Sequence, residues 1–232
     1  MKKTYNNLIS GIRNHFKKNN MKKAVIGLSG GIDSALSLRL LSDAIGNKNI
    51  TALLMPEKGL SKKIHVEDSI GLCRSLKVNY DIIPINGFIR PYLKLPWRSK
   101  LAEMNTRARI RATILYSYAN ANNALVIGTS NKTELRLGYF TKYGDGAVDV
   151  EVIGDLYKTE VYQLAGYLKL PKNFITKRPS AELKENHADE DEIGETYEKI
   201  DNMLKTRKIS KKIRDMINKN KHKTTKVQII KK

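Results

Sequence analysis

The chain has 232 residues, which is enough for one α/β domain with a well-buried core. Hydrophobic residues make up 41% of it, and no apolar run approaches the roughly 20 residues of a membrane helix, so we expect no membrane partner. The single cysteine, Cys73, excludes an internal disulfide and predicts a packed thiol in a cytoplasmic protein. No apolar segment follows the charged N-terminus, so we expect no secretory signal.

The net charge of +20 is distributed unevenly. Twelve of the 43 lysines and arginines lie in a basic C-terminal tail at about 205–232, which holds a single acid. A strongly basic chain can bind nucleic acid, and it can equally bind an anionic small substrate. The tail lacks the interleaved aromatic residues that a single-strand binder would use for base stacking. We therefore expect no nucleic-acid partner.

Helical and strand-like patterns alternate along the first half of the chain. Apolar spacing and turn residues predict helices over 4–20, 33–45 and 62–76, and strands over 24–28, 50–55 and 80–83. Such alternation is typical of a parallel sheet with helices on both faces, that is, of a Rossmann-like α/β fold.

The second half adds one strand and several helices. The patterns predict an irregular segment over 87–97, a helix over 105–121, a strand over 124–128, a glycine-rich loop over 137–154 and a helix over 158–168. An acidic stretch over 185–195 precedes a last helical pair and the basic tail. No linker-like segment divides the chain, so we predict one domain over 1–232.

The first predicted strand runs into Ser29-Gly30-Gly31-Ile32-Asp33-Ser34, and a helix follows. A glycine turn between a strand and a helix N-terminus binds phosphate, because backbone N–H groups and the helix dipole face the anion. The segment is not a Walker A loop, since no lysine follows the glycines. Asp33 suits a phosphate site if Mg²⁺ lies between the acid and the phosphates. The alternative is a plain turn in which Asp33 and Ser34 cap the helix.

Two further segments carry polar side chains near strand ends. Thr129 and Glu134 follow the strand over 124–128, where open α/β sheets bind ligands. We expect Glu134 to supply a second carboxylate for Mg²⁺, and the alternative is a capped helix starting near Ser130. Lys158 opens a predicted helix, a position that the helix dipole disfavours for a cation, and this suggests an anionic ligand. We expect both carboxylates at the surface, so alanine substitutions would abolish activity and leave the fold intact.

The glycine turn resembles the pyrophosphate loop of the N-type ATP pyrophosphatases, whose fold is adenine nucleotide alpha hydrolase-like. The segments over 128–132 and 138–146 resemble the NAD⁺ synthetase family, as do those over 179–181 and 189–194. The resemblance extends over roughly 25–223. It implies a C–N bond-forming ligase that adenylates deamido-NAD⁺ with ATP and Mg²⁺, and then amidates it with ammonia to give NAD⁺, AMP and pyrophosphate. It also implies a homodimer.

The resemblance further assigns individual residues. ATP would be bound by Gly27, Leu28, Ser29, Gly30, Gly31, Ile32, Asp33, Ser34, Thr129, Lys158 and Ser180. Deamido-NAD⁺ would be bound by Arg109, Lys142, Asp149, His222 and Lys223. Asp33 and Glu134 would hold Mg²⁺ and, with Lys158, would be catalytic. Lys158 would stabilise charge on the transferring phosphoryl group.

Free ammonia is the expected nitrogen donor. A glutamine-dependent enzyme needs a glutaminase domain with a catalytic cysteine, and Cys73 lies in a helical pattern with no nucleophile motif around it. The sequence does not exclude a separate glutaminase subunit.

Two alternative functions are also consistent with the sequence. One is another N-type ATP pyrophosphatase, such as a GMP synthetase subunit or a tRNA-modifying enzyme. The other is a basic nucleic-acid-binding protein, which would bind RNA with steep salt dependence and without ATP turnover.

Overall fold

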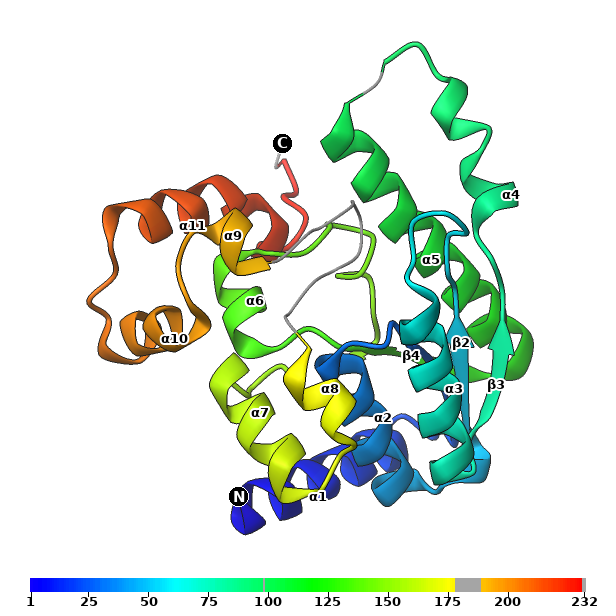
Figure 1. Ribbon diagram of the computed structural model, residues 1–232. Coiled ribbons are helices and arrows are strands. Elements are labelled where there is room, and N and C mark those ends of the chain that lie inside the picture. The colour runs from blue at the N-terminus through cyan, green and yellow to red at the C-terminus, as the bar shows by residue number, and fades with distance from the viewer. Residues whose placement is uncertain (98, 178–188, 231–232) are drawn as a thin grey trace.

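The computed structural model describes residues 1–97, 99–177 and 189–230 (Figure 1). The predicted ATP contact Ser180 and the motif over 179–181 lie outside these residues. Within the described part of the chain, no helix is both long and apolar enough to cross a membrane.

A five-stranded sheet forms the centre of the structure, and all its strands are parallel. The strand order is β3-β2-β1-β4-β5. The strands are β1 (Lys23–Gly27), β2 (Ile50–Leu54), β3 (Asn79–Ile82), β4 (Ala124–Gly128) and β5 (Val150–Glu151). The chain thus moves outward from β1 on one side and returns as β4 on its other side. This reversal places a topological switch point between the carboxyl ends of β1 and β4, which is where such sheets bind ligands.

Helices cover both faces of the sheet, as the sequence predicts. Alternate strand residues face opposite sides: Ala24 and Ile26 belong to one hydrophobic cluster, and Val25 belongs to the other. The first cluster is formed with α1 (Lys2–Lys18), α2 (Ile32–Ile45), α3 (Lys63–Leu76), α7 (Lys158–Tyr167) and α8 (Lys172–Thr176). The second is formed with α4 (Asn86–Ile89) and α5 (Lys100–Asn122). The predicted α/β fold class is therefore confirmed.

Four helices of the later chain form a separate cluster beside the sheet (Figure 1). They are α6 (Lys132–Leu137), α9 (Asp189–Ile193), α10 (Tyr197–Thr206) and α11 (Lys211–Thr224). Buried Ile213 of α11 and Ile200 of α10 pack with Leu137 of α6. Much of the basic tail is therefore a helix packed against the element that follows β4. The prediction of a single domain over 1–232 stays a prediction.

Some elements differ from their predicted form. The irregular segment over 87–97 contains the end of α4 and a 3-10 turn, η2 (Tyr92–Lys94), and a second such turn, η1 (Asn47–Asn49), precedes β2. Helix α5 begins five residues earlier than predicted, because Ser99 accepts a hydrogen bond from the Ala102 N–H and caps it. The glycine-rich loop contains β5, whose two residues are too few to produce an alternating pattern.

We expect Leu38→Ala to destabilise the fold by about 2–5 kcal/mol, because Leu38 of α2 is fully buried and its truncation leaves a cavity. Chemical denaturation measures the free energy of unfolding. Ile64→Ala on α3 is the control, since Ile64 is exposed and its loss should change stability by less than about 0.5 kcal/mol. Equal effects of the two substitutions would contradict this packing.

Candidate active site

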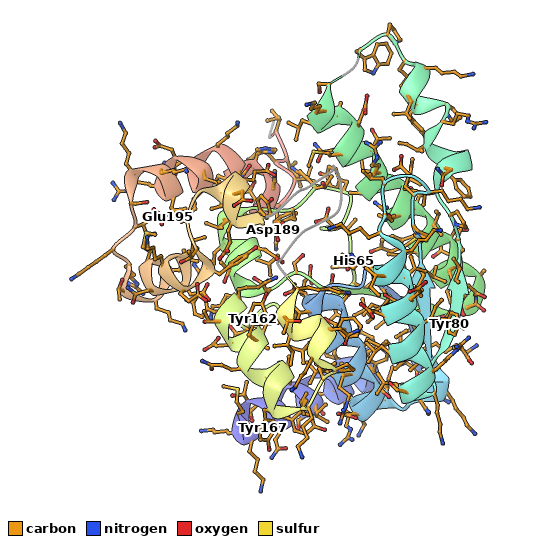
Figure 2. All side chains as sticks on the ribbon, viewed as in Figure 1. His65, Tyr80, Tyr162, Tyr167, Asp189 and Glu195 are labelled. Carbon is orange, nitrogen blue, oxygen red and sulfur yellow. The ribbon has the colours of Figure 1, made fainter. Side chains whose placement is uncertain are left out.

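A cavity of about 290 Å³ lies at the switch point between β1 and β4. The segment after β1 and the segment after β4 both line it, including Thr129, Glu134 and Lys158. Other elements complete the wall. His65 of α3 and Asp189 of α9, both labelled in Figure 2, line the cavity from different parts of the chain. The predicted ATP positions at 27–34 therefore share one concave site with Thr129 and Lys158.

The glycine loop at 29–34 is held in shape by its own serines. The Ser34 hydroxyl donates to the Gly31 carbonyl at 3.0 Å, and the Gly31 N–H donates to Ser29 Oγ at 3.3 Å. Gly30 has a φ of +84°, and a Cβ there would lie 2.7 Å from Cβ of His65. Only glycine suits this position, because both the backbone conformation and the neighbouring helix exclude a side chain.

The N-terminus of α2 faces this loop. Its N-cap is Gly31, and no side chain among the described residues caps it. The alternative in which Asp33 and Ser34 cap the helix is therefore not what the structure shows. Unpartnered N–H groups and the positive end of the helix dipole make such a terminus suited to an anion. The side chains of Leu28 and Ile32 are buried, so these two predicted ATP contacts can offer backbone groups.

The three predicted catalytic residues meet inside the protein. Lys158 Nζ lies 2.5 Å from Asp33 Oδ2 and 3.6 Å from Glu134 Oε1. The exposed fraction is 2% for the Lys158 side chain, 19% for Asp33 and 16% for Glu134. The expectation that both carboxylates lie at the surface was therefore wrong. The segments after β1 and β4 are covered by α7 and by the helices beside the sheet, which strand-end position alone does not reveal.

Burial and charge oppose each other in this cluster. Burial raises the pKa of Glu134, and the nearby Lys158 ammonium only partly offsets that effect. Burial by itself would lower the pKa of Lys158, but the carboxylates of Asp33 and Glu134 outweigh it and raise the pKa above its usual value. Lys158 is therefore a fixed positive charge at the cavity wall.

Backbone capping positions the two acids. Asn131 and Glu134 form a capping box at the start of α6, in which Asn131 Oδ1 accepts the Glu134 N–H and Glu134 Oε2 accepts the Asn131 N–H. The cap is Asn131 rather than Ser130. Its amide nitrogen also donates to Asp33 Oδ1 at 2.9 Å. One buried asparagine thus orients both carboxylates.

The donor set fits Mg²⁺. The carboxylates of Asp33 and Glu134 lie on the same cationic group, Lys158 Nζ. Mg²⁺ is usually held by one or two carboxylates together with substrate phosphates and water, and the N-terminus of α2, the predicted phosphate site, lines the same cavity. Asp33 and Glu134 are therefore suitable ligands on chemical grounds.

Four of the predicted substrate-binding residues come together at the glycine-rich loop. Arg109 donates to the Lys142 carbonyl at 3.4 Å, and Lys142 Nζ donates to the His222 carbonyl at 2.7 Å. Lys223 Nζ donates to two carbonyls of the same loop, at 2.9 and 2.8 Å. These contacts join α5, the loop and α11 into one basic surface. In this structure Lys223 holds the loop itself, through backbone carbonyls.

Asp149 makes no hydrogen bond, among the described residues, to the other four predicted substrate-binding residues. Its carboxylate accepts the Val126 N–H at 2.7 Å and the Tyr116 hydroxyl at 3.2 Å, so it ties the loop to β4 and α5. The arginines on either side of Arg109 also have structural partners. Arg107 pairs with Glu57 at 2.6 Å, and Arg111 donates to the Met55 carbonyl at 3.0 Å. Arg109 is the exposed member of the three.

Sequence reasoning missed several residues of this site. Lys177 lines the cavity, pairs with Asp68 and donates to the Gly30 carbonyl at 3.2 Å. Asp189 also lines it, from a helix more than 150 residues after the glycine loop. Asn131 could have been found from the N-x-x-E pattern of a capping box. No local signal marks Lys177, and although Asp189 begins a segment that resembles the family, only tertiary folding brings either residue to the cavity. Cys73 is buried with a pKa raised by burial to about 11, which confirms the predicted packed thiol.

A parallel sheet with an anion-binding loop at its switch point and a charged cavity beside it defines an α/β nucleotide-binding fold. The sequence pattern of the NAD synthase family matches residues 4–232. A relative from Archaeoglobus fulgidus, named NH(3)-dependent NAD(+) synthetase, is 50% identical over 182 residues, which are 78% of this chain and 74% of the relative.

Two solved structures extend this comparison over nearly the whole chain. An NH3-dependent NAD synthetase from Campylobacter jejuni matches with a TM-score of 0.82 and 37% identity. An NMN synthetase from Francisella tularensis matches with a TM-score of 0.91 and 34% identity. Each match covers 99% of this chain and 98% of the other. The chain belongs to the NAD synthase family and is, as predicted, a ligase.

We expect Asp33→Ala to lower the free energy of unfolding by about 3–5 kcal/mol, because it leaves the buried Lys158 ammonium without its nearest partner. Chemical denaturation measures the loss, and Asp33→Ala/Lys158→Met should recover much of it. The control is Asp155→Ala, which removes a 2.7 Å pair with Lys132 at a site where Asp155 is 89% exposed. That change should cost less than about 1 kcal/mol. If Asp33→Ala were as mild as the control, the cluster would not be buried as described.

A second prediction concerns Glu151, which accepts the Ser130 N–H at 2.9 Å behind the cavity wall. Burial raises its pKa from 4.5 to about 7. The folded state therefore binds a proton more tightly than the unfolded state. The resulting stability is fully present below the unfolded pKa and is lost as the pH rises through about 7. Glu151→Gln should flatten the decline in stability between about pH 5 and about pH 8, measured by denaturation at both values. An unchanged slope would show that Glu151 does not titrate in this range.

Proposed function

We propose that this ligase is an ammonia-dependent NAD⁺ synthetase that activates the nicotinate carboxylate of deamido-NAD⁺ with ATP. The observation that carries the proposal is the buried Lys158 between Asp33 and Glu134, beside the N-terminus of α2, which no side chain of the described residues caps. The bond that breaks joins the α-phosphate of ATP to pyrophosphate. A fixed cation can hold the α-phosphate, and a helix N-terminus in the same cavity can hold the pyrophosphate.

The chain's own residues have separate roles in the first step. The backbone of 29–34 and the α2 N-terminus bind the leaving pyrophosphate, and Lys158 stabilises negative charge on the α-phosphate. Asp33 and Glu134 would hold Mg²⁺, which supplies charge neutralisation on the phosphate oxygens when bound. A carboxylate oxygen of the substrate attacks the α-phosphorus, and the bond to pyrophosphate breaks. The product is a mixed anhydride with AMP.

Ammonia then attacks the carbonyl carbon of this anhydride. A C–N bond forms, the C–O bond to AMP breaks, and the nitrogen loses a proton to become the amide of NAD⁺. Activation is required because a free carboxylate resists attack by an amine, whereas a mixed anhydride does not.

The basic surface formed by Arg109, Lys142, His222 and Lys223 is the proposed site for the dinucleotide. Its positive charge suits the two phosphates of deamido-NAD⁺. Binding across a homodimer interface and a cytoplasmic location are further parts of the proposal. The homodimer rests on the family resemblance, and light scattering of the purified protein tests it. The location is supported by the unpaired, buried Cys73.

A second candidate substrate is nicotinate mononucleotide, whose amidation product is NMN. The observation that favours it is the TM-score of 0.91 to the structure named NMN synthetase. The same activation chemistry serves both substrates, because the nicotinate carboxylate is common to them. They differ in the adenylate half, which the basic surface would bind. The ratio of kcat/KM for the two substrates therefore decides between the candidates.

We expect purified protein with ATP, Mg²⁺, deamido-NAD⁺ and ammonium to form NAD⁺ and AMP in equal amounts. Glutamine should not replace ammonium. The mononucleotide is tested in parallel under the same conditions. Failure of both substrates would overturn the proposal. ATP–pyrophosphate exchange with XMP and with tRNA would then test the other ATP pyrophosphatases, and salt-dependent RNA retention would test a nucleic-acid-binding function.

A further inference from the structure

Helix α10 contributes a carboxylate that lies behind the cavity wall, within the protein. Asp201 is buried, with 2% of its surface exposed. Its Oδ1 accepts the Thr133 hydroxyl at 2.5 Å, and its Oδ2 accepts the Thr159 N–H at 2.9 Å. Thr133 Oγ1 in turn accepts the Lys158 N–H at 3.0 Å. Asp201 is therefore linked to two consecutive backbone N–H groups, that of Lys158 through Thr133 and that of Thr159 directly.

These bonds cap α7 from another helix. The first N–H groups of a helix have no partner within it, and those of Lys158 and Thr159 begin α7. Asp201 accepts the Thr159 N–H directly, and Thr133, which donates to Asp201, accepts the Lys158 N–H. Its negative charge also lies at the positive end of the α7 dipole, where an acid is stabilising. Lysine is a poor first residue for a helix on electrostatic grounds, and the acid supplied by α10 offsets that disadvantage.

The same helix also contacts the other end of the Lys158 side chain. Lys158 Nζ lies 5.1 Å from the ring centroid of Tyr197, which is buried four residues before Asp201. Residues four apart share one face of a helix. One face of α10 therefore acts on both ends of Lys158. Asp201 reaches the Lys158 backbone N–H through Thr133, and the Tyr197 ring lies near the Lys158 ammonium.

We propose that Asp201 is a positioning residue, which fixes the start of α7 so that the Lys158 ammonium reaches the phosphate site. The proposal rests on the function of Lys158 proposed above. Asp201 itself lies behind Thr133 and does not line the cavity. Its effect on the reaction is therefore exerted through Lys158, and it requires no contact with ATP.

The test compares Asp201→Ala and Asp201→Asn with the wild-type enzyme by ATP–pyrophosphate exchange with deamido-NAD⁺, well below the melting temperature of each variant. We expect Asp201→Ala to lower kcat about tenfold to hundredfold with KM for ATP unchanged, since a small displacement of a catalytic group is costly in rate. Asp201→Asn should recover part of the loss, because an amide oxygen can still accept the Thr159 N–H. If Asp201→Ala does not fold, Asp201→Asn alone still carries the kcat comparison.

The matched control is Asp43→Asn. Asp43 also joins two helices, accepting the Tyr5 hydroxyl at 3.1 Å and Arg39 Nε at 2.9 Å, and it lies outside the cavity. A purely structural role for Asp201 would lower the melting temperature of both variants and leave kcat of both unchanged. That result would overturn the proposal, and so would a rise in KM alone.

Lys158→Met separates this proposal from the one on which it rests. If Lys158→Met is inactive and Asp201→Ala retains the wild-type kcat, the positioning role is wrong and the function of Lys158 stands. If Lys158→Met retains the wild-type kcat, the catalytic function of Lys158 is wrong, and the positioning role is wrong with it. A fall in kcat for both Lys158→Met and Asp201→Ala, without one for Asp43→Asn, supports the proposal.

Discussion

The structure of this protein depends on a charge held inside it. Lys158 is 2% exposed, and an isolated ammonium buried to that degree would lose its proton or disrupt the fold. Asp33 and Glu134 keep it charged, and each of these acids is held in turn by Asn131. The cluster is costly to bury and contributes little net stability compared with apolar packing. Its arrangement is better explained by chemistry, because a pre-oriented cation in a protein cavity stabilises developing negative charge more strongly than one in water.

The topology of the sheet explains why these residues meet. The strand order reverses at β1, so the segments that follow β1 and β4 lie side by side at the carboxyl edge. The first of them brings the glycine loop and Asp33, and the second brings Asn131 and Glu134. Helix α7 then starts close to both and supplies Lys158. Three segments that are distant in sequence thus form one site. The positive end of the α2 dipole lies at the same site.

The C-terminal helices appear as an addition to the sheet, yet they hold the site together (Figure 1). Helix α10 contacts α6 and α7, the two helices that carry Glu134 and Lys158. Helix α11 contacts α6 and the glycine-rich loop, whose carbonyls accept hydrogen bonds from Lys223. Six of the twelve lysines and arginines of the basic tail therefore lie on a packed helix.

The sequence by itself determined the α/β fold, because apolar periodicity and turn residues are local properties that survive in any environment. It also predicted an anion site at 29–34, since glycines between a strand and a helix expose backbone N–H groups wherever they occur. The residue patterns and the family resemblance together predicted roles for Asp33, Glu134 and Lys158, and these roles stay predictions. Only the tertiary structure decided that Lys158 is buried between two half-buried carboxylates, that Asn131 rather than Ser130 caps α6, and that Lys177, Asp189 and Asp201 contribute to the site or its support. Two residues of β5 and a carboxylate on a distant helix carry no periodic signal, because their positions follow from packing between segments far apart in the chain.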